Sequence, residues 1–360
     1  MMRYGVAGCG MMGQEHIRNI ALLGQAEVSA LLEPDSAMAA AAQALVPEAS
    51  LCPDLPSMVL RNDVDALVIA TPNHLHMAQL REVAGTRPLP ILVEKPLYNS
   101  RSDESALEEL IRHYPAPIWV AMEYRYMPPI ARFREMAEDV TGGIRMLTIR
   151  EHRFPFLPKV GHWNRFNRNT GGTMVEKCCH FFDLMRLILR DEPVRVMASA
   201  GQAVNHLDER YEDAVPDIWD HGYVIVDFAR GARAMLELCM FAEGADYQEE
   251  LSAIGPEGKI AAYVPGPKRF WNFDLGPQPV PHLIVSPRAP TGPSRIEVPV
   301  DPQLLDAGDH NGATYYQHRR FLDAIRHGRR PEVSLADGAA AVRMGLAAQE
   351  AALTGQAVTL

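Results

Sequence analysis

Cysteine is scarce in this 360-residue chain. The five cysteines, at positions 9, 52, 178, 179 and 239, form neither a C-x-x-C pair nor a disulfide framework, and this usage fits a reducing compartment. No uninterrupted apolar run approaches the roughly 20 residues that span a bilayer. Residues 1–6 enter a strand-like sequence at once and lack the basic and apolar regions of a signal peptide. We therefore expect a cytoplasmic protein with no membrane partner.

Positive charge is also in short supply. The chain has 35 Lys and Arg residues against 45 Asp and Glu residues, which gives a formal net charge of −10. A nucleic-acid partner or an anionic membrane surface would need a basic face, so the balance argues against both. At roughly 100–200 residues per domain, the length predicts two domains.

The first 33 residues follow the order of a dinucleotide-binding unit. A short apolar strand over 3–7 runs into the turn Gly8-Cys9-Gly10-Met11-Met12-Gly13, and a helical pattern follows. In such a turn the first glycine allows the tight bend, the second lets a pyrophosphate approach the backbone, and the third lets the helix pack on the strand. Free N–H groups at the helix N-terminus then meet the phosphates. The ordered motif predicts a bound dinucleotide.

A carboxylate follows the second strand. Strand 27–32 ends at Glu33, twenty positions after Gly13, where an acidic side chain accepts hydrogen bonds from the ribose hydroxyls. This carboxylate would repel the 2′-phosphate of NADP, and no arginine occurs at positions 34–36. The alternative interpretation of Glu33 is a solvated acid in a turn. The sequence favours NAD as the cofactor.

Alternation of helix and strand continues to residue 122. A helix is expected over 37–45, and apolar runs over 66–70, 90–93 and 118–122 read as buried parallel strands. Each run ends in a polar cluster, where open α/β sheets bind ligands. The three clusters are Thr71-Pro72-Asn73-His74-Leu75-His76, Glu94-Lys95-Pro96 and Glu123-Tyr124-Arg125-Tyr126. We predict an α/β dinucleotide-binding domain over 1–122.

The second domain, 123–360, has a different pattern. Alternating strands are expected over 145–152, 194–200, 222–228, 232–238 and 249–254, and a largely helical segment over 314–353. Runs of strands with few helices between them indicate an α+β domain with a large, mainly antiparallel open sheet. Its uncovered face would be available for self-association, so we expect a homodimer or homotetramer.

A buried helix with a polar stripe is expected after Gly171-Gly172. Thr173 is the expected N-cap, the helix would continue to Leu189, and Glu176, His180 and Asp183 would share one face. A polar stripe on a buried helix must be hydrogen-bonded internally or face a polar cavity. Its functional interpretation is an acid–base pair of Glu176 and His180, with Asp183 tying the helix to a neighbouring element. A core histidine beside a solvated glutamate is the alternative, and the spacing disfavours a metal.

Taken together, these motifs make the chain resemble the glucose–fructose oxidoreductase/inositol dehydrogenase family. The matching motifs are the Gly8 turn, Thr71-Pro72-Asn73-His74, Glu94-Lys95-Pro96, 171–183 and Ser334-Leu335-Ala336-Asp337-Gly338. The resemblance implies an N-terminal Rossmann domain, NAD(P) as cofactor and a sugar, cyclitol or polyol substrate. It further implies that Lys95 reaches the reacting hydroxyl and the nicotinamide ribose, that the Lys95–Pro96 bond is cis, and that His180 is the general base. Glu176 stands where Asp is usual and Cys178 where Gly is common.

The expected site follows from these motifs. Lys95, His180 and Glu176 are the catalytic candidates, and Tyr124, Trp163, Asn167 and His310 are the substrate-binding candidates. The expected cofactor-binding residues are Gly8, Gly10, Met11, Met12, Gly13, Glu33, Thr71, Pro72, Asn73, His76, Glu94 and Lys95. The function expected is hydride transfer between NAD and a secondary alcohol. Two alternatives remain open: an NAD-retaining glycoside hydrolase or lyase, and a non-catalytic NAD-binding regulator.

Overall fold

The short apolar runs of the first domain form a parallel sheet in the computed structural model, which describes residues 1–289 and 291–360. All its neighbouring strands are parallel, in the order β3-β2-β1-β4-β5-β6. Every residue of β4 and β5 is buried, as expected where both faces of a sheet are covered. The strands are β1 (Met2–Ala7), β2 (Ala26–Leu32), β3 (Ser50–Leu51), β4 (Ala66–Ile69), β5 (Ile91–Val93) and β6 (Ile118–Val120).

Helices connect these strands and complete the first domain. Aspartate side chains cap the N-termini of two of these helices: Asp35 accepts from Met38 N–H, and Asp54 accepts from Ser57 N–H. The predicted dinucleotide-binding fold is confirmed, and its order of strands reverses between β1 and β4, where such sheets bind ligands. The helices are α1 (Met11–Leu22), α2 (Ser36–Leu45), α3 (Leu55–Val59), α4 (His76–Thr86) and α5 (Glu104–His113).

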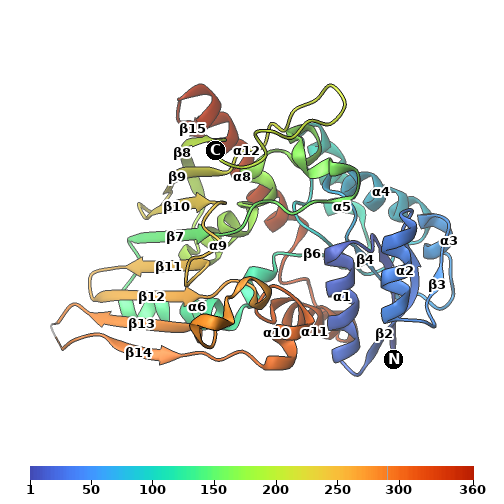
Figure 1. Ribbon diagram of the computed structural model, residues 1–360, viewed down its shortest axis with the longest axis horizontal. Helices are drawn as coiled ribbons and strands as arrows, with labels where there is room; N and C mark the ends of the chain where they lie inside the picture. Colours follow the sequence, from blue (N-terminus) through green and yellow to red (C-terminus); the bar gives the residue numbers. More distant parts are fainter. Residues whose placement is uncertain (290) are drawn as a thin grey trace.

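The second domain is built on a nine-stranded sheet that lies beside the first (Figure 1). Its order is β14-β13-β12-β11-β7-β10-β9-β8-β15. Within residues 1–289 and 291–360, β7 and β10 are the only neighbours in this sheet that pair in parallel, so the predicted mainly antiparallel sheet is confirmed. The strands are β7 (Met146–His152), β8 (Pro193–Gly201), β9 (His221–Phe228), β10 (Arg233–Cys239), β11 (Glu249–Ile254), β12 (Gly258–Val264), β13 (His282–Pro287), β14 (Ser294–Glu297) and β15 (Val358–Thr359).

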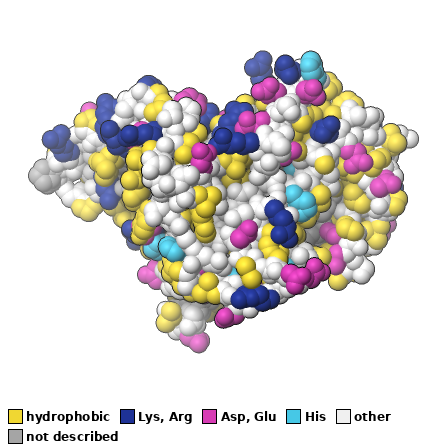
Figure 2. Space-filling view, turned by 90° about the horizontal axis from the view of Figure 1, so that it is seen from above, with side chains coloured by type: hydrophobic (Ala, Val, Ile, Leu, Met, Phe, Trp, Pro, Cys, Tyr) yellow, Lys and Arg dark blue, Asp and Glu magenta, His cyan; other side chains and the backbone are white. Residues whose placement is uncertain are grey.

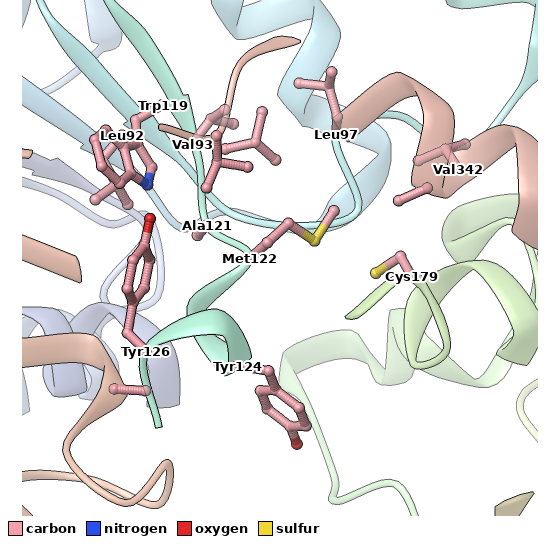
Figure 3. Packing of buried hydrophobic residues seen from close by; sticks show 14 of the residues in the cluster. Leu92, Val93, Leu97, Trp119, Ala121, Met122, Tyr124, Tyr126, Cys179 and Val342 are labelled. Carbon is pink, nitrogen blue, oxygen red and sulfur yellow. The ribbon is translucent and has the colours of Figure 1, made fainter. Parts of the chain in front are cut away.

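Helices cover one face of this sheet and join it to the first domain. Val120 N–H donates to Val333 O, which brings the C-terminal segment back to β6. Buried side chains from β5, β6, α9 and α12 pack together at this junction (Figure 3). The helices are α6 (Pro128–Thr141), α7 (Asn167–Thr170), α8 (Thr173–Glu176), α9 (Cys179–Leu189), α10 (Pro302–Ala307), α11 (Ala313–Arg326) and α12 (Leu335–Thr354).

The helix predicted over 174–189 is wrong in one respect, because it is broken into α8 and α9. Cys178 N–H donates to Thr173 O rather than to an oxygen four residues back, and the chain restarts at Cys179. The predicted N-cap is also wrong. Gly172 occupies that position, with a φ of 91°, and the Thr173 hydroxyl donates to Trp219 O at 2.7 Å. A tertiary hydrogen bond has therefore replaced the local one.

One face of the molecule carries charges of both signs. On the face shown in Figure 2, cationic and acidic side chains are interspersed with hydrophobic ones. Among the helices of residues 1–289 and 291–360, none has the length and apolar character needed to cross a membrane.

Candidate active site

One large cavity lies between the two domains. Its volume is about 710 Å³, and it extends from the Gly8 turn to α8 and α9 of the second domain. Most of the predicted site residues line it: Gly8, Gly10, Met11, Met12, Glu33, Thr71, Pro72, Asn73, Glu94, Lys95, Trp163, Glu176, His180 and His310. Four lie behind the wall or outside it, namely Gly13, His76, Tyr124 and Asn167. The structure thus brings both predicted halves of the site together.

The glycine turn has the shape that a pyrophosphate requires. Gly8 has a φ of +86°, and a Cβ there would lie 2.5 Å from the backbone of Ala70. A Cβ on Gly13 would lie 2.0 Å from Gly8 O, so this glycine allows the close packing of α1 on β1. Around Gly10 nothing lies within 4 Å of the Cβ position among the described residues. The open space beside Gly10, at the N-terminus of α1, fits the phosphates of a dinucleotide.

Glu33 is held in place at the end of β2. Its Oε2 accepts from Cys9 N–H at 2.7 Å and its Oε1 accepts from Asp35 N–H at 3.0 Å. These bonds fix the carboxylate on the cavity wall, and each oxygen retains a lone pair for a ribose hydroxyl. The geometry suits the adenosine ribose of NAD.

Lys95 enters the cavity from the turn after β5. The Lys95–Pro96 bond is cis, as the family resemblance implied. His76 is fully buried behind this turn, where its Nδ1 lies 2.8 Å from Pro96 O and its Nε2 lies 3.0 Å from Thr71 O. His76 therefore joins two cavity loops instead of lining the cavity.

The ammonium group of Lys95 points toward the second domain. Lys95 Nζ donates to Glu176 O at 3.2 Å. Burial alone would lower the pKa of Lys95, but surrounding acidic groups, Glu123 and Glu94 among them, outweigh it and raise the pKa. Lys95 is therefore a charged hydrogen-bond donor at neutral pH, not a base.

Glu176 and His180 lie on either side of the break between α8 and α9, and both line the cavity. Burial raises the pKa of Glu176 to about 7, against the opposing charges of Lys95 and Lys159. The Oε2 atom of Glu176 is buried and has no hydrogen-bond partner within the described part of the chain. Burial and the cations of Lys95 and Lys177 lower the pKa of His180 well below its usual range, so its imidazole is neutral.

Asp183, on the same helix as His180, forms a bidentate ion pair with Arg125. This ion pair confirms the structural interpretation of Asp183.

Glu123 is a cavity residue that the sequence reasoning did not single out. It is 1% exposed, and its Oε1 lies 3.5 Å from His180 Nε2 and 3.8 Å from His310 Nε2. Burial and the neighbouring Glu94 raise the pKa of Glu123 to about 7. Its sequence signal was a charged residue three positions after the end of a buried strand, β6. A buried carboxyl beside a neutral histidine is suited to proton transfer.

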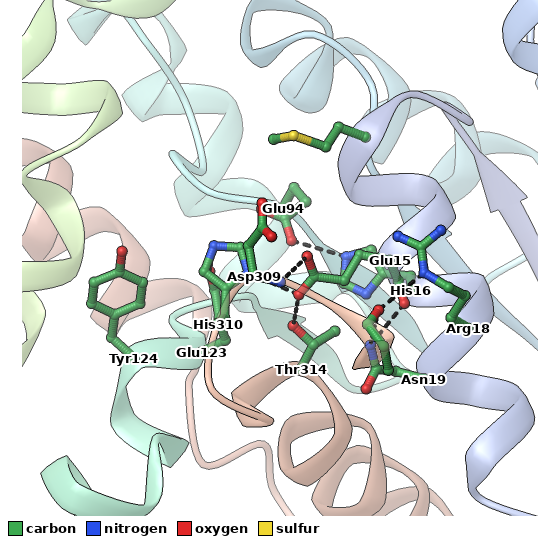
Figure 4. A network of polar contacts seen from close by, with 12 residues as sticks. Glu15, His16, Arg18, Asn19, Glu94, Glu123, Tyr124, Asp309, His310 and Thr314 are labelled. Carbon is green, nitrogen blue, oxygen red and sulfur yellow. Dashed lines mark hydrogen bonds and ion pairs between the residues drawn. The ribbon is translucent and has the colours of Figure 1, made fainter. Parts of the chain in front are cut away.

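His310 reaches the cavity from the loop before α11 (Figure 4). Its Nδ1 lies 2.8 Å from Glu15 Oε1, which also accepts from the Thr314 hydroxyl at 2.7 Å. Burial alone would lower the pKa of His310, but Glu15 outweighs it and raises the pKa to about 9. His310 is therefore an imidazolium at neutral pH. Glu15, on α1, connects the dinucleotide turn to this loop.

Tyr124 supports His180 from behind. The two rings stack at 4.2 Å with an interplanar angle of 6°, and the Tyr124 hydroxyl accepts from Lys177 Nζ at 2.6 Å. Lys177 Nζ also lies 2.8 Å from Glu151 Oε1. Burial and the charge of Arg153 lower the pKa of Lys177 to about 8. Tyr124 is 2% exposed and does not line the cavity.

The segment 153–167 forms the remaining wall. Trp163 lines the cavity, and its ring meets that of His74 edge-on at 6.3 Å. Asn167 is placed elsewhere, because it begins α7 and its Nδ2 donates to Asp217 O at 2.8 Å. Arg153, Phe154, Phe156 and Lys159 also line the cavity, although the sequence reasoning did not name them.

Two family models together match nearly all of this chain. Residues 2–122 match the NAD-binding Rossmann fold of an oxidoreductase family, and residues 134–360 match the C-terminal alpha/beta domain of the same family, named GFO_IDH_MocA. An inositol 2-dehydrogenase of Rhizobium meliloti is 28% identical over 262 residues, which is 72% of this chain and 75% of that protein. One from Arthrobacter sp. is 30% identical over 248 residues, 67% of this chain and 68% of that protein.

Solved structures show the same fold. A levoglucosan dehydrogenase in complex with NADH and levoglucosan superposes with a TM-score of 0.81 at 20% identity, over 99% of both chains. A myo-inositol dehydrogenase from Corynebacterium glutamicum superposes with a TM-score of 0.77 at 20% identity, over 100% of this chain and 99% of that one. With its glycine turn and Glu33 in place, the chain belongs to the GFO_IDH_MocA oxidoreductase family and is an NAD-dependent dehydrogenase acting on CH–OH groups.

Proposed function

We propose that this protein oxidises a secondary alcohol of a sugar, cyclitol or polyol at the end of the cavity lined by Lys95, His180 and Glu176. The observation that carries the proposal is that these three residues share one cavity with the dinucleotide turn. The names of the relatives, inositol 2-dehydrogenase and levoglucosan dehydrogenase, support the substrate class. Bound NAD supplies the hydride-accepting carbon, C4 of its nicotinamide ring.

Lys95 stabilises the oxygen of the reacting alcohol. Its ammonium group is held near α8 by Glu176 O and stays charged at neutral pH. A charged donor aimed at this oxygen stabilises the negative charge that develops as the proton leaves. Lys95 therefore lowers the barrier without itself taking the proton.

His180 accepts the hydroxyl proton as the carbon loses its hydride, and a ketone results. Its neutral imidazole has the capacity to bind a proton, and Glu123 lies 3.5 Å from Nε2. The Glu123 carboxylate stabilises the imidazolium as it forms. Tyr124 fixes the plane of the ring by stacking. We assign Glu123 and Tyr124 as positioning residues that act through His180.

Glu176, Trp163 and His310 bind the rest of the substrate. The unpartnered oxygen of Glu176 is an acceptor for a neighbouring hydroxyl, and the His310 imidazolium is a donor. An aromatic face such as Trp163 packs on the C–H groups of a sugar ring. Asn167 has no part in this proposal, because its side chain is engaged with Asp217.

NADH absorbance with a panel of inositols, hexoses and linear polyols tests the proposal. We expect NADH to accumulate in proportion to the ketone formed. Cleavage of a glycoside with no net NADH would instead indicate the hydrolase or lyase reaction. Binding of these compounds without any reaction would indicate a regulator.

We also propose a cytoplasmic homodimer or homotetramer that assembles through the uncovered face of the nine-stranded sheet. Exposed apolar side chains gather on that face, including Met146, Tyr223, Ile225 and Ile254. The five thiols are free, which fits a reducing compartment. Light scattering during gel filtration measures the assembly, and Tyr223→Glu should shift it toward the monomer.

A further inference from the structure

The second-domain wall of the cavity carries cations that hydride transfer does not use. Arg153 and Lys159 follow β7 and line the cavity together with Phe154, Phe156 and Trp163. Neither cation belongs to the dinucleotide turn, and neither contacts Lys95 or His180 in an ion pair or hydrogen bond among the described residues. Their place on the substrate side of the cavity calls for a separate explanation.

Lys159 has no matching anion. Across residues 1–289 and 291–360, its ammonium group forms neither an ion pair nor a hydrogen bond. The charged groups that face it are Lys95, Arg153, Glu176 and Glu94. Glu94 is already engaged with His16 Nε2 at 2.9 Å, and Glu176, with a pKa of about 7, is only partly ionised at neutral pH. Burial lowers the pKa of Lys159, as expected for a cation without a partner.

Arg153 is oriented but only partly neutralised. Its guanidinium lies 4.3 Å from the centre of the Phe154 ring, and its Nε donates to Phe154 O at 3.2 Å. Its Nη1 lies 3.6 Å from Glu151 Oε1, the same oxygen that Lys177 Nζ approaches to 2.8 Å. One carboxylate is therefore shared by two cations. The guanidinium lies over an aromatic ring, and its charge is not fully matched.

We propose that the substrate carries a carboxylate and that Lys159 and Arg153 bind it, so that the preferred substrate is a sugar acid rather than a neutral sugar or cyclitol. This inference rests on the proposed function. Lys159 with a half-matched Arg153 leaves roughly one positive charge to neutralise, which suits a carboxylate better than a doubly charged phosphate. A planar guanidinium also matches the geometry of a carboxylate. The side chains of Phe154 and Phe156, which lie between the two cations in sequence and line the same cavity, would hold the C–H face of the ring.

Comparing a sugar with its uronic acid isolates the effect of the substrate's carboxylate. Glucose is compared with glucuronate and galactose with galacturonate, and glucose 6-phosphate serves as the phosphate probe. For each compound we measure kcat/KM for NADH formation and the shift in melting temperature with NADH present. The variants are Lys159→Gln and, as a matched control, Lys268→Gln, a surface lysine that pairs with Asp306. The KM for NAD is measured in every protein.

We expect a sugar acid to exceed its neutral partner in kcat/KM and to raise the melting temperature by roughly 1–3 °C at ten times its Kd. In Lys159→Gln the ratio of acid to neutral kcat/KM should fall roughly 10- to 100-fold, the loss of one charge-assisted hydrogen bond. Lys268→Gln should leave the ratio unchanged. The KM for NAD should stay within about 3-fold in Lys159→Gln, because this lysine lies on the substrate side.

Three results would overturn the inference. They are a neutral sugar preferred over its acid, a ratio that Lys159→Gln does not change, and a phosphate preferred in a Lys159-dependent manner. The proposed function fails separately. If a sugar acid stabilises the protein and Lys159→Gln abolishes that shift while no compound yields NADH, the carboxylate site stands and the dehydrogenase proposal for these substrates does not.

Discussion

In the half of the cavity next to β1, backbone geometry sets the shape of the site, whereas in the half next to α9 buried side-chain charges set its properties. The first half comes mostly from one stretch of chain, the turn at 8–13 and Glu33. The second half gathers Lys95, Glu123, Glu176, His180 and His310 from segments that span more than two hundred residues. The glycine turn suits the pyrophosphate that every NAD molecule carries. The buried charges of the second half suit one particular reaction.

The largest expected effect lies in the second half. Lys95→Ala removes the charged donor to the reacting oxygen, so we expect kcat to fall by about 1000-fold or more. The measurement is NADH formation at saturating NAD and substrate. Lys268→Ala, a change on the surface, provides the control and should leave kcat unaltered. Turnover that survives in Lys95→Ala would show that the alcohol oxygen lies elsewhere.

Substitutions in the glycine turn should weaken cofactor binding rather than the chemical step. Gly10→Ala places a Cβ in open space, so the fold should be unaffected, while the Kd for NADH should rise roughly 10- to 100-fold because the pyrophosphate loses its close approach. Gly13→Ala places a Cβ 2.0 Å from Gly8 O and should lower the melting temperature as well. Calorimetric titration and thermal unfolding of the two variants separate these effects. Equal stability in both would contradict the packing role assigned to Gly13.

Glu123 should make kcat, which the cavity half next to α9 determines, depend on pH. With the pKa of Glu123 at about 7, its carboxylate form becomes available to His180 as the pH rises through 7, so kcat should rise over that range. Glu123→Gln should lower kcat roughly 10-fold at pH 8 and remove this contribution to the pH profile. An unaltered profile in Glu123→Gln would exclude Glu123 from the proton path.

The same residue should affect stability in a defined direction. The pKa of Glu123 is raised above its unfolded value, so its stabilising contribution is complete below about pH 4.5 and is lost as the pH rises through 7. Glu123→Gln should therefore gain stability relative to the parent protein between pH 5 and pH 8, by as much as about 3 kcal/mol. Denaturant unfolding at the two pH values measures this difference.

Glu33 tests cofactor choice in the first half. Glu33→Gln keeps the shape of the side chain but removes the charge that repels the 2′-phosphate. The preference for NAD over NADP should fall roughly 10-fold. The matched control is Glu27→Gln, an exposed acid on the same strand, which should leave the preference intact. A preference unchanged in Glu33→Gln would place the ribose away from Glu33.

The smallest effect is expected at Asn167. Its side chain contacts Asp217 rather than the cavity, so Asn167→Ala should change kcat/KM by less than about 3-fold. A substrate-specific loss of 10-fold or more would mean that the segment before α7 moves into the cavity in the working enzyme.

These contrasts explain how much was predictable. The turn, Glu33 and the parallel strands were readable because each depends on residues close together in sequence, and the mainly antiparallel second sheet followed from strand alternation. Arg153 and Lys159 were missed because only the tertiary fold shows that they reach the cavity, whereas Glu123 stood in a polar cluster after a buried strand but was not singled out. The N-cap position was missed because the Thr173 hydroxyl bonds to Trp219, which is distant in sequence. Asn167 was chosen for its chemistry, and its partner Asp217 lies fifty residues away.

Cofactor binding and chemistry should be separable within this one cavity. The most direct test is to titrate His180→Ala with NADH, with binding monitored by energy transfer from tryptophan, and to measure turnover on the same sample. We predict a Kd for NADH within about 3-fold of the parent value together with a loss of turnover of about 1000-fold or more. Turnover that persists, or an NADH affinity that is lost together with turnover, would contradict the account.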